Sequence, residues 1–244
     1  MVKGIDIFQE YFNEYTDQYV LIGGAACSVS FEEQDINFGR TTKDLDIVLI
    51  VEAQTKEFGE RFWKFIKDGK YRIRAKSNGE PQFYRFDKPD ERFPKMIELF
   101  SRTNYLLQEE NGLTPIHIDD SVSSLSAILL NDAYYQALMD GRENMRGISV
   151  LKPEWIIPFK AKAWLDLREK KDVDSSDIKK HRNDIIRIVS DMVLQKCILP
   201  DEVRKDMEKF IEQFDVTESE LKNLKIRGTK PEDIKRVLQT TYLD

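Results

Sequence analysis

The sequence RTTKDLDIVLIV, at residues 40–51, decides the fold class because it joins a polar loop to a buried strand. From Asp44 onward it is rich in β-branched residues and long enough for a strand in the core of a sheet. Side chains alternate between the two faces of a strand, so Asp44 and Asp46 share one face and Leu45, Ile47 and Leu49 share the other. The stretch therefore predicts a central strand of a mixed α/β protein.

A second predicted strand and a double glycine precede this stretch. Residues 19–22 form a short apolar run, and Gly23 and Gly24 separate it from residues 25–31, which favour a helix. Backbone N–H groups at such a turn can bind phosphate oxygens. A tight turn without a ligand is the alternative, since neither the Gly-x-Gly-x-x-Gly fingerprint nor the end of a P-loop is present. Helical spacing of apolar residues over 6–19 predicts a first helix.

Further strands are expected after the central one. An apolar stripe over residues 57–67 predicts a helix that covers the sheet, and residues 71–75 and 82–86 alternate around a turn-forming segment, as in a hairpin. Residues 94–100 then read as a strand in which Glu98 stands among apolar neighbours. The first part of the chain thus contains helices and strands in alternation.

The sequence becomes mostly helical beyond about residue 121. The segments with helical spacing or helix-start residues are 125–138, 153–171, 176–194, 200–214, 218–225 and 230–242, and residues 147–151 read as a short strand. Thr217 to Glu220 has the form of a capping box. We therefore expect an α/β domain over residues 1–152 and a helical domain over residues 153–244 that closes an active-site cleft.

Composition narrows the class of protein. The chain has 244 residues, of which 41% are hydrophobic, so it is long enough for one large or two small domains with their own cores. Its net charge of -6 argues against a general polyanion binder. Two cysteines and two histidines are too few for a disulfide scaffold or a histidine-rich zinc site. No apolar run approaches the ~18 residues of a membrane span, and the N-terminus lacks a signal sequence, so we expect a cytoplasmic protein without a membrane segment.

Three carboxylates are the candidate metal ligands. Asp44 and Asp46 lie on one face of a buried strand, where like charges repel unless a cation compensates them. Magnesium takes carboxylate oxygens together with waters and phosphates, and a neighbouring strand could bring Glu98 beside the pair. The alternatives are solvated aspartates at a strand end and a surface position for Glu98 on an edge strand.

The order of these motifs resembles the three-part signature of the nucleotidyltransferase superfamily related to DNA polymerase β. The resemblance implies that Gly23 and Gly24 lie on a turn at a triphosphate, that Asp44 and Asp46 bind magnesium, and that Glu98 completes the triad. Thr42 and Lys43, just before the aspartates, become candidates for phosphate contact, with a solvated loop as the alternative.

The second half of the chain resembles the helical part of the AbiEii-type nucleotidyltransferases, the toxin components of type IV toxin–antitoxin systems. The sequences IIPFKAKAWL at residues 156–165 and KKHRNDIIR at residues 179–187 match that pattern. The resemblance assigns Lys160, Lys180 and Asp184 to the family's two lysines and its last aspartate. His181 stands where the family usually has an acid, and no role is carried over to it.

Helical geometry gives Lys160 a separate argument. Lys160 interrupts the inward apolar stripe of its predicted helix, whereas Lys162 points elsewhere. It could face a cleft or extend its ammonium group to water along an apolar surface. Asp184 lies at the border of the apolar face of its own helix, so a pair with Lys160 is possible, as part of a site or as an ordinary interhelical ion pair.

The expected function is nucleotidyl transfer. Magnesium and a nucleoside triphosphate would bind at the aspartates and the glycine turn, Lys160 and Lys180 would neutralise the phosphates, and an acceptor hydroxyl would attack the α-phosphorus. The family resemblance implies a tRNA acceptor and a cognate antitoxin. Residues 158–187 carry nine lysines and arginines against six acids, an excess of three that suits RNA or a solvated helix face equally. A small-molecule or protein acceptor and a non-catalytic binding module are the alternatives.

Overall fold

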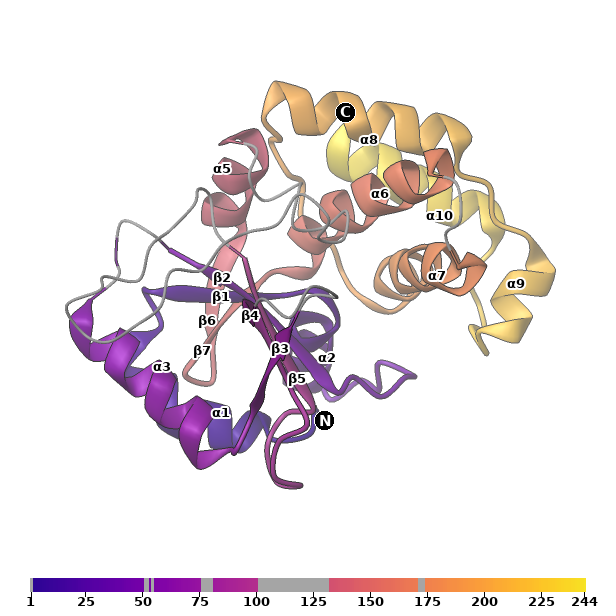
Figure 1. The fold of residues 1–244 in the computed structure, drawn as a ribbon. Helices are drawn as coiled ribbons and strands as arrows, with labels where there is room; N and C mark the ends of the chain where they lie inside the picture. The colour runs from indigo at the N-terminus through magenta and orange to yellow at the C-terminus, as the bar shows by residue number, and fades with distance from the viewer. Residues whose placement is uncertain (1, 51–52, 54, 76–80, 101–131, 171–173) are drawn as a thin grey trace. The chain divides into compact units, whose positions relative to one another are not determined.

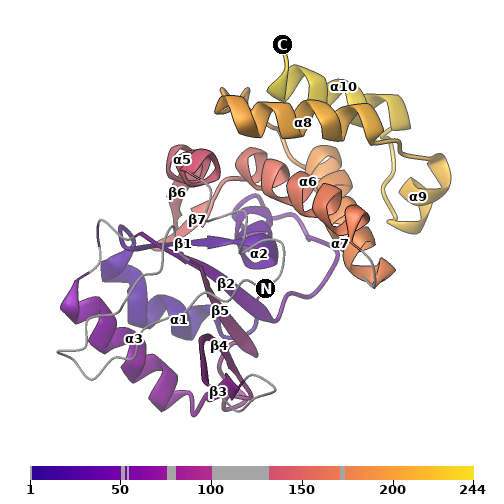
Figure 2. The same ribbon diagram turned by 45° about the horizontal axis from the view of Figure 1, so that its top comes forward.

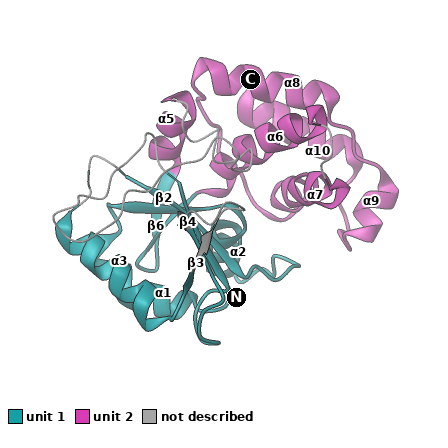
Figure 3. Ribbon diagram, in the orientation of Figure 1, with its two compact units in different colours: residues 1–130, 142–151 teal, residues 131–141, 152–244 magenta. Residues whose placement is uncertain are grey.

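A computed structural model describes residues 2–50, 53, 55–75, 81–100, 132–170 and 174–244 (Figure 1). The chain divides into two compact units, the first with residues 1–130 and 142–151 and the second with residues 131–141 and 152–244 (Figure 3). The longer segment of the second unit starts at residue 152, and the sequence predicted a helical domain from residue 153. The second unit also includes helix α5 (Asp132–Gly141), which lies before that boundary in the chain.

The first unit contains a seven-stranded mixed sheet with the order β3-β4-β5-β2-β1-β7-β6. Its strands are β1 (Tyr19–Ile22), β2 (Asp44–Leu49), β3 (Arg72–Ala75), β4 (Pro81–Asp87), β5 (Met96–Phe100), β6 (Arg142–Met145) and β7 (Ile148–Leu151). Strand β2 runs antiparallel to β1 and parallel to β5, and β1 runs parallel to β7. The predicted mixed α/β class is confirmed.

The helices of the first unit are α1 (Ile5–Phe12), α2 (Gly23–Glu33) and α3 (Lys56–Asp68), with a 3₁₀ turn at Asn13–Tyr15. The helix predicted over residues 6–19 was too long. The apolar spacing continues past Phe12, but Tyr15 reaches the ring of Phe58 from the 3₁₀ turn, with 5.8 Å between ring centroids. Tyr19 already belongs to β1. Apolar residues from a helix, a 3₁₀ turn and a strand thus produced a spacing that resembled one helix.

Helices α1 and α3 cover the apolar face of the sheet with aromatic side chains, and α2 lies on the other side (Figure 2). Phe12 lies 5.4 Å from Phe65 between ring centroids, and Phe62 lies 5.7 Å from Phe86 of β4. Phe86 is paired with Ile97, which is paired with Leu45, so the covered face is apolar across three strands. The polar residues of these strands therefore lie on the opposite face, on the side of α2.

The second unit consists of helices. Besides α5 they are α6 (Pro153–Glu169), α7 (Ser175–Asp191), α8 (Asp201–Gln213), α9 (Glu218–Asn223) and α10 (Pro231–Tyr242). Helix α6 packs between its neighbours, with Trp164 5.3 Å from Phe210 of α8 between ring centroids. The predicted capping box is present, since Thr217 and Glu220 cap the start of α9 reciprocally. The five predicted helices after residue 152 are confirmed to within a few residues at their ends.

Two sequence predictions fall partly or wholly outside the described residues. The hairpin turn at 77–81, except for residue 81, and the first half of the helix predicted over 125–138 lie there; the second half of that helix is part of α5. Strand β6 was not predicted, because its sequence RENM has no apolar alternation and its backbone is held by pairing with β7. Within the described ranges, none of the helices has the length and apolar character needed to cross a membrane.

Candidate functional site

A row of charged residues crosses the central strands of the sheet. Ile22 of β1 is paired with Asp46 of β2, Asp46 with Glu98 of β5, and Glu98 with Arg85 of β4. Neighbouring strands lie about 4.8 Å apart, so the carboxylates of Asp46 and Glu98 extend from adjacent backbone positions. Asp44 lies two residues earlier on the same face of β2, and both aspartates are half-buried. The sheet thus brings together two of the three predicted ligands and leaves the third one step along the strand.

The glycine turn meets this row at Asp46. Helix α2 starts at Gly23, whose φ of 65° favours glycine, and a Cβ atom at that position would overlap Oδ2 of Asp46. A Cβ atom on Gly24 would lie 2.8 Å from Nη2 of Arg40 and 3.0 Å from Oγ1 of Thr42. The turn therefore lies against both the aspartate strand and the loop before it. The start of a helix also favours negative charge.

The loop before β2 is partly packed into the protein. Thr42 is 6% exposed, and its hydroxyl donates a hydrogen bond of 3.3 Å to the carbonyl of Gly24. Ser28 and Arg40 each donate a hydrogen bond of 3.4 Å to the same hydroxyl oxygen. Lys43 is exposed, and its carbonyl accepts a 2.8 Å hydrogen bond from the amide of Lys95. Lys43 is therefore open to solvent, whereas Thr42 is buried and its hydroxyl fixes the loop to the glycine turn.

Two arginines at the site were not assigned a role from the sequence. Arg40 lies against Gly24, with its guanidinium carbon 5.0 Å from the centroid of the Phe38 ring. Arg85 forms an ion pair with Oε1 of Glu98. Arg40 stands in the quoted motif itself and could have been considered from there. Arg85 gave no such signal, because its place beside Glu98 depends on the pairing of β4 with β5.

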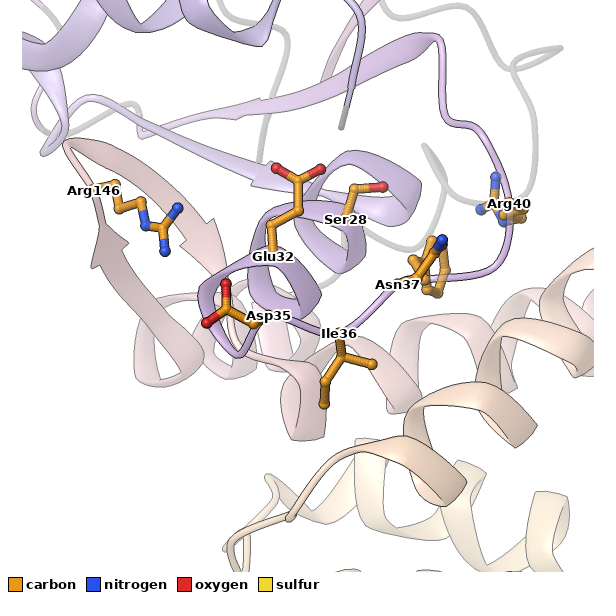
Figure 4. A pocket seen from close by; sticks show the side chains of 8 residues that line it. Ser28, Glu32, Asp35, Ile36, Asn37, Arg40 and Arg146 are labelled. Carbon is orange, nitrogen blue, oxygen red and sulfur yellow. The ribbon is translucent and has the colours of Figure 1, made fainter. Parts of the chain in front are cut away.

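A cavity of about 450 Å³ lies along α2 (Figure 4). It is lined by Ser28, Glu32, Asp35, Ile36, Asn37, Phe38, Arg40 and Arg146. Ser28 and Arg40 both bond to Thr42, so the cavity adjoins the packed loop and the glycine turn. Its size is in the range of small-molecule sites, and acidic and basic groups are mixed in its lining.

Lys160 and Asp184 form a buried ion pair in the second unit. Nζ of Lys160 donates a 2.6 Å hydrogen bond to Oδ2 of Asp184, and the side chains are 5% and 1% exposed. The predicted pairing of these residues across two helices is confirmed. Lys162 points elsewhere, as predicted, and lies 3.0 Å from Asp166. The expectation that Lys160 neutralises a triphosphate meets a physical obstacle, because Asp184 already offsets its charge.

Two further residues of the predicted site lie on the same helix as Asp184. Lys180 is exposed one turn before it, so its ammonium group is available to an anion from solvent. His181, where the sequence departs from the AbiEii pattern, is half-buried. Of the two lysines expected at phosphates, the exposed one is therefore Lys180.

The three carboxylates do not lie close enough together to form a complete set of metal ligands. Across the part of the chain that the structure describes, no three Asp, Glu, His or Cys side chains group closely enough to hold a metal ion. Magnesium is nevertheless commonly bound by one or two carboxylates, with waters and substrate phosphates as the other ligands. Asp46 and Glu98, on adjacent strands, meet that smaller requirement, and Asp44 lies on the same face.

A scan against protein-family models found no matching family, and searches of curated proteins and of solved structures found no significant match. The function must therefore be argued from the site itself.

Proposed function

We propose that this protein is a magnesium-dependent nucleotidyltransferase that moves a nucleoside monophosphate from a nucleoside triphosphate to an acceptor hydroxyl. The observation that carries the proposal is the row in which Asp46 lies opposite Glu98 and against Gly23 at the start of α2. Three separate motifs of the sequence meet there, in the combination that a metal-bound triphosphate requires.

The glycine turn would bind the phosphates. The first N–H groups of a helix have no partner within it, and their partial positive charge favours anions. Gly23 and Gly24 have no side chains that would keep a phosphate from this backbone. Arg40, whose Nη2 lies over Gly24, would add a guanidinium with several N–H donors to the same end of the helix.

The carboxylates of the row would hold the metal. Asp44, Asp46 and Glu98 supply the oxygen ligands that magnesium prefers. When bound, magnesium offsets the charge of the phosphates and polarises the α-phosphoryl group. Glu98 would also take the proton of the acceptor hydroxyl, whose oxygen forms a bond to the α-phosphorus as the bond to pyrophosphate breaks.

The kind of acceptor is proposed from the family resemblance and the second unit. AbiEii-type toxins imply tRNA as the acceptor and a cognate antitoxin as a partner. Lys179 and Lys180 are exposed on α7, and residues 158–187 have an excess of three basic residues over acids. Such a local excess favours contact with an RNA backbone. Lys160 would act indirectly, because its pair with Asp184 joins α6 to α7.

The proposal is tested by transfer of label from each of the four α-labelled triphosphates to total RNA or to total protein. We expect label on RNA with wild-type protein, and a loss of about 100-fold or more with Asp46→Asn, as for removal of a preorganised electrostatic group. Asp87→Asn is the matched control, since it removes one negative charge from β4, on the same sheet.

Two results would count against the proposal. Label on protein with none on RNA would show that the acceptor is a protein and not tRNA, while the nucleotidyl transfer itself would stand. Equal transfer by wild type and Asp46→Asn would show that the charged row is not the active site.

A further inference from the structure

Arg85 is the third charged residue in the row, next to the two carboxylates. Strand β4 pairs with β5 so that Arg85 lies opposite Glu98, and its guanidinium forms an ion pair with Oε1 of that residue. The side chain of Arg85 is 23% exposed and that of Glu98 is 13% exposed. The carboxylate that the proposed function assigns to a metal is thus held by a protein cation.

Electrostatics explain why a cation is needed there. Carboxylates directly opposite each other on adjacent strands repel, and half-burial strengthens the repulsion. Asp44 adds a third negative charge on the same face. An arginine remains charged at all physiological pH values and presents several donors to a carboxylate. Through its ion pair with Glu98, Arg85 brings a positive charge to the row.

A second ion pair, between β3 and β4, is the comparison for an exposed cross-strand pair. Arg72 of β3 donates to Asp87 of β4 at 3.0 Å, and the arginine side chain is 57% exposed. Asp87 lies opposite Arg72 on β3 and opposite Met96 on β5, and neither of these residues is acidic. Arg85 differs in both respects, because it is more buried and its partner lies opposite Asp46.

We infer that Arg85 competes with the divalent cation for Glu98, so that the site takes a metal–triphosphate complex in preference to the metal alone. This inference rests on the proposed function. A metal ion that takes Oε1 of Glu98 as its ligand displaces the guanidinium, which then loses its anionic partner. A metal–triphosphate complex brings a cation for Glu98 and an anion for Arg85 together, so the exchange leaves both groups paired. The binding of metal and of triphosphate is therefore coupled through Arg85.

The test measures Mn²⁺ binding by electron paramagnetic resonance, without nucleotide and with a non-hydrolysable triphosphate analogue. We expect Arg85→Gln to tighten binding of Mn²⁺ alone by about 10-fold, the factor for loss of one charge-assisted competitor. We also expect it to weaken the enhancement of Mn²⁺ binding by the analogue. Arg72→Gln removes the same charge from the same hairpin and should change the affinity by less than about 2-fold.

Several outcomes separate this inference from the proposed function. If wild type binds Mn²⁺, Asp46→Asn abolishes binding and Arg85→Gln leaves the affinity unchanged or lower, the inference fails and the metal site stands. If Arg72→Gln tightens binding as much as Arg85→Gln, general charge and not displacement is the cause, and the inference fails. If neither wild type nor Arg85→Gln binds Mn²⁺ in the presence of the triphosphate analogue, the proposed function fails with it.

A second measurement uses wild-type protein and does not depend on the folding of a variant. In wild-type protein, the ¹⁵Nε resonance of Arg85 should shift when Mg²⁺ and the triphosphate analogue are added, because the guanidinium leaves Glu98. The Nε resonance of Arg72 should stay in place. An unchanged Arg85 resonance under conditions in which the metal complex is bound would overturn the inference.

Discussion

Removal of one partner of the Lys160–Asp184 pair is expected to destabilise the second unit strongly. Asp184→Asn keeps the size of the side chain but leaves an ammonium group at a site where the two side chains are 5% and 1% exposed. At 2.6 Å and an effective dielectric constant of 20, the Coulomb attraction that is lost amounts to about 6 kcal/mol. Desolvation of the pair in the wild type offsets part of this energy.

Deprotonation of Lys160 sets an upper limit on the cost. Neutralising a lysine of ordinary pKa at pH 7 takes about 4.6 kcal/mol, so the protein can escape a larger penalty by losing the proton. The expected loss of unfolding free energy is therefore about 3–5 kcal/mol, the range for breaking one partner of a buried pair. The double variant Lys160→Met/Asp184→Leu should lie within about 2 kcal/mol of wild type, because apolar residues of similar volume leave no unpaired charge.

Urea unfolding in a Trp63→Phe background measures these differences, because the two remaining tryptophans, Trp155 and Trp164, both lie on α6. Lys162→Met is the matched control on the same helix, since its ion pair with Asp166 is partly exposed, and we expect a loss of at most about 1 kcal/mol. A loss below about 1 kcal/mol for Asp184→Asn would refute the reasoning. So would a double variant less stable than the single one.

Three further predictions concern the glycine turn and the last helices. Gly23→Ala should lower the melting temperature and weaken triphosphate binding, because φ is 65° and a Cβ atom would overlap Asp46; unchanged values of both would contradict this. Thr217→Ala should cost about 1 kcal/mol in urea unfolding through loss of the capping box. The hydrogen bond from Arg182, with Thr217 adding to it, holds the pKa of Glu220 below its usual 4.5, so this contribution to stability is full above pH 4.5 and is lost as the pH falls through the lowered pKa. Arg182→Gln should therefore flatten the acid limb of a stability–pH curve, and an unaltered limb would show that the pair does not contribute.

Local patterns in the sequence predicted much of the fold. In the site, they predicted the shared face of the aspartates and the glycine turn. Alternation over β2 placed Asp44 and Asp46 on one face, and the apolar run before Gly23 gave both β1 and the start of α2. These features follow from the chain's local geometry and from burial on one face. They can be read without knowledge of which strands are neighbours.

The remainder depends on contacts between distant segments. The positions of Glu98 beside Asp46 and of Arg85 beside Glu98 follow from the strand order β4-β5-β2, which no local pattern contains. Thr42 lies in a loop with polar neighbours, which favoured a solvated side chain. Packing against α2 buries it instead. Periodicity also overestimated the length of α1, since half-buried Tyr15 of the 3₁₀ turn and buried Tyr19 of β1 continued its spacing.

The central claim is that the row of Asp46 and Glu98 beside the glycine turn transfers nucleotides with the help of magnesium. Its most direct test is label transfer from α-labelled triphosphates to total RNA, with wild type and Asp46→Asn compared in Mg²⁺ and in chelator. We expect labelled RNA only for wild type in Mg²⁺. Equal labelling by Asp46→Asn, or labelling by wild type that persists in chelator, would contradict the account.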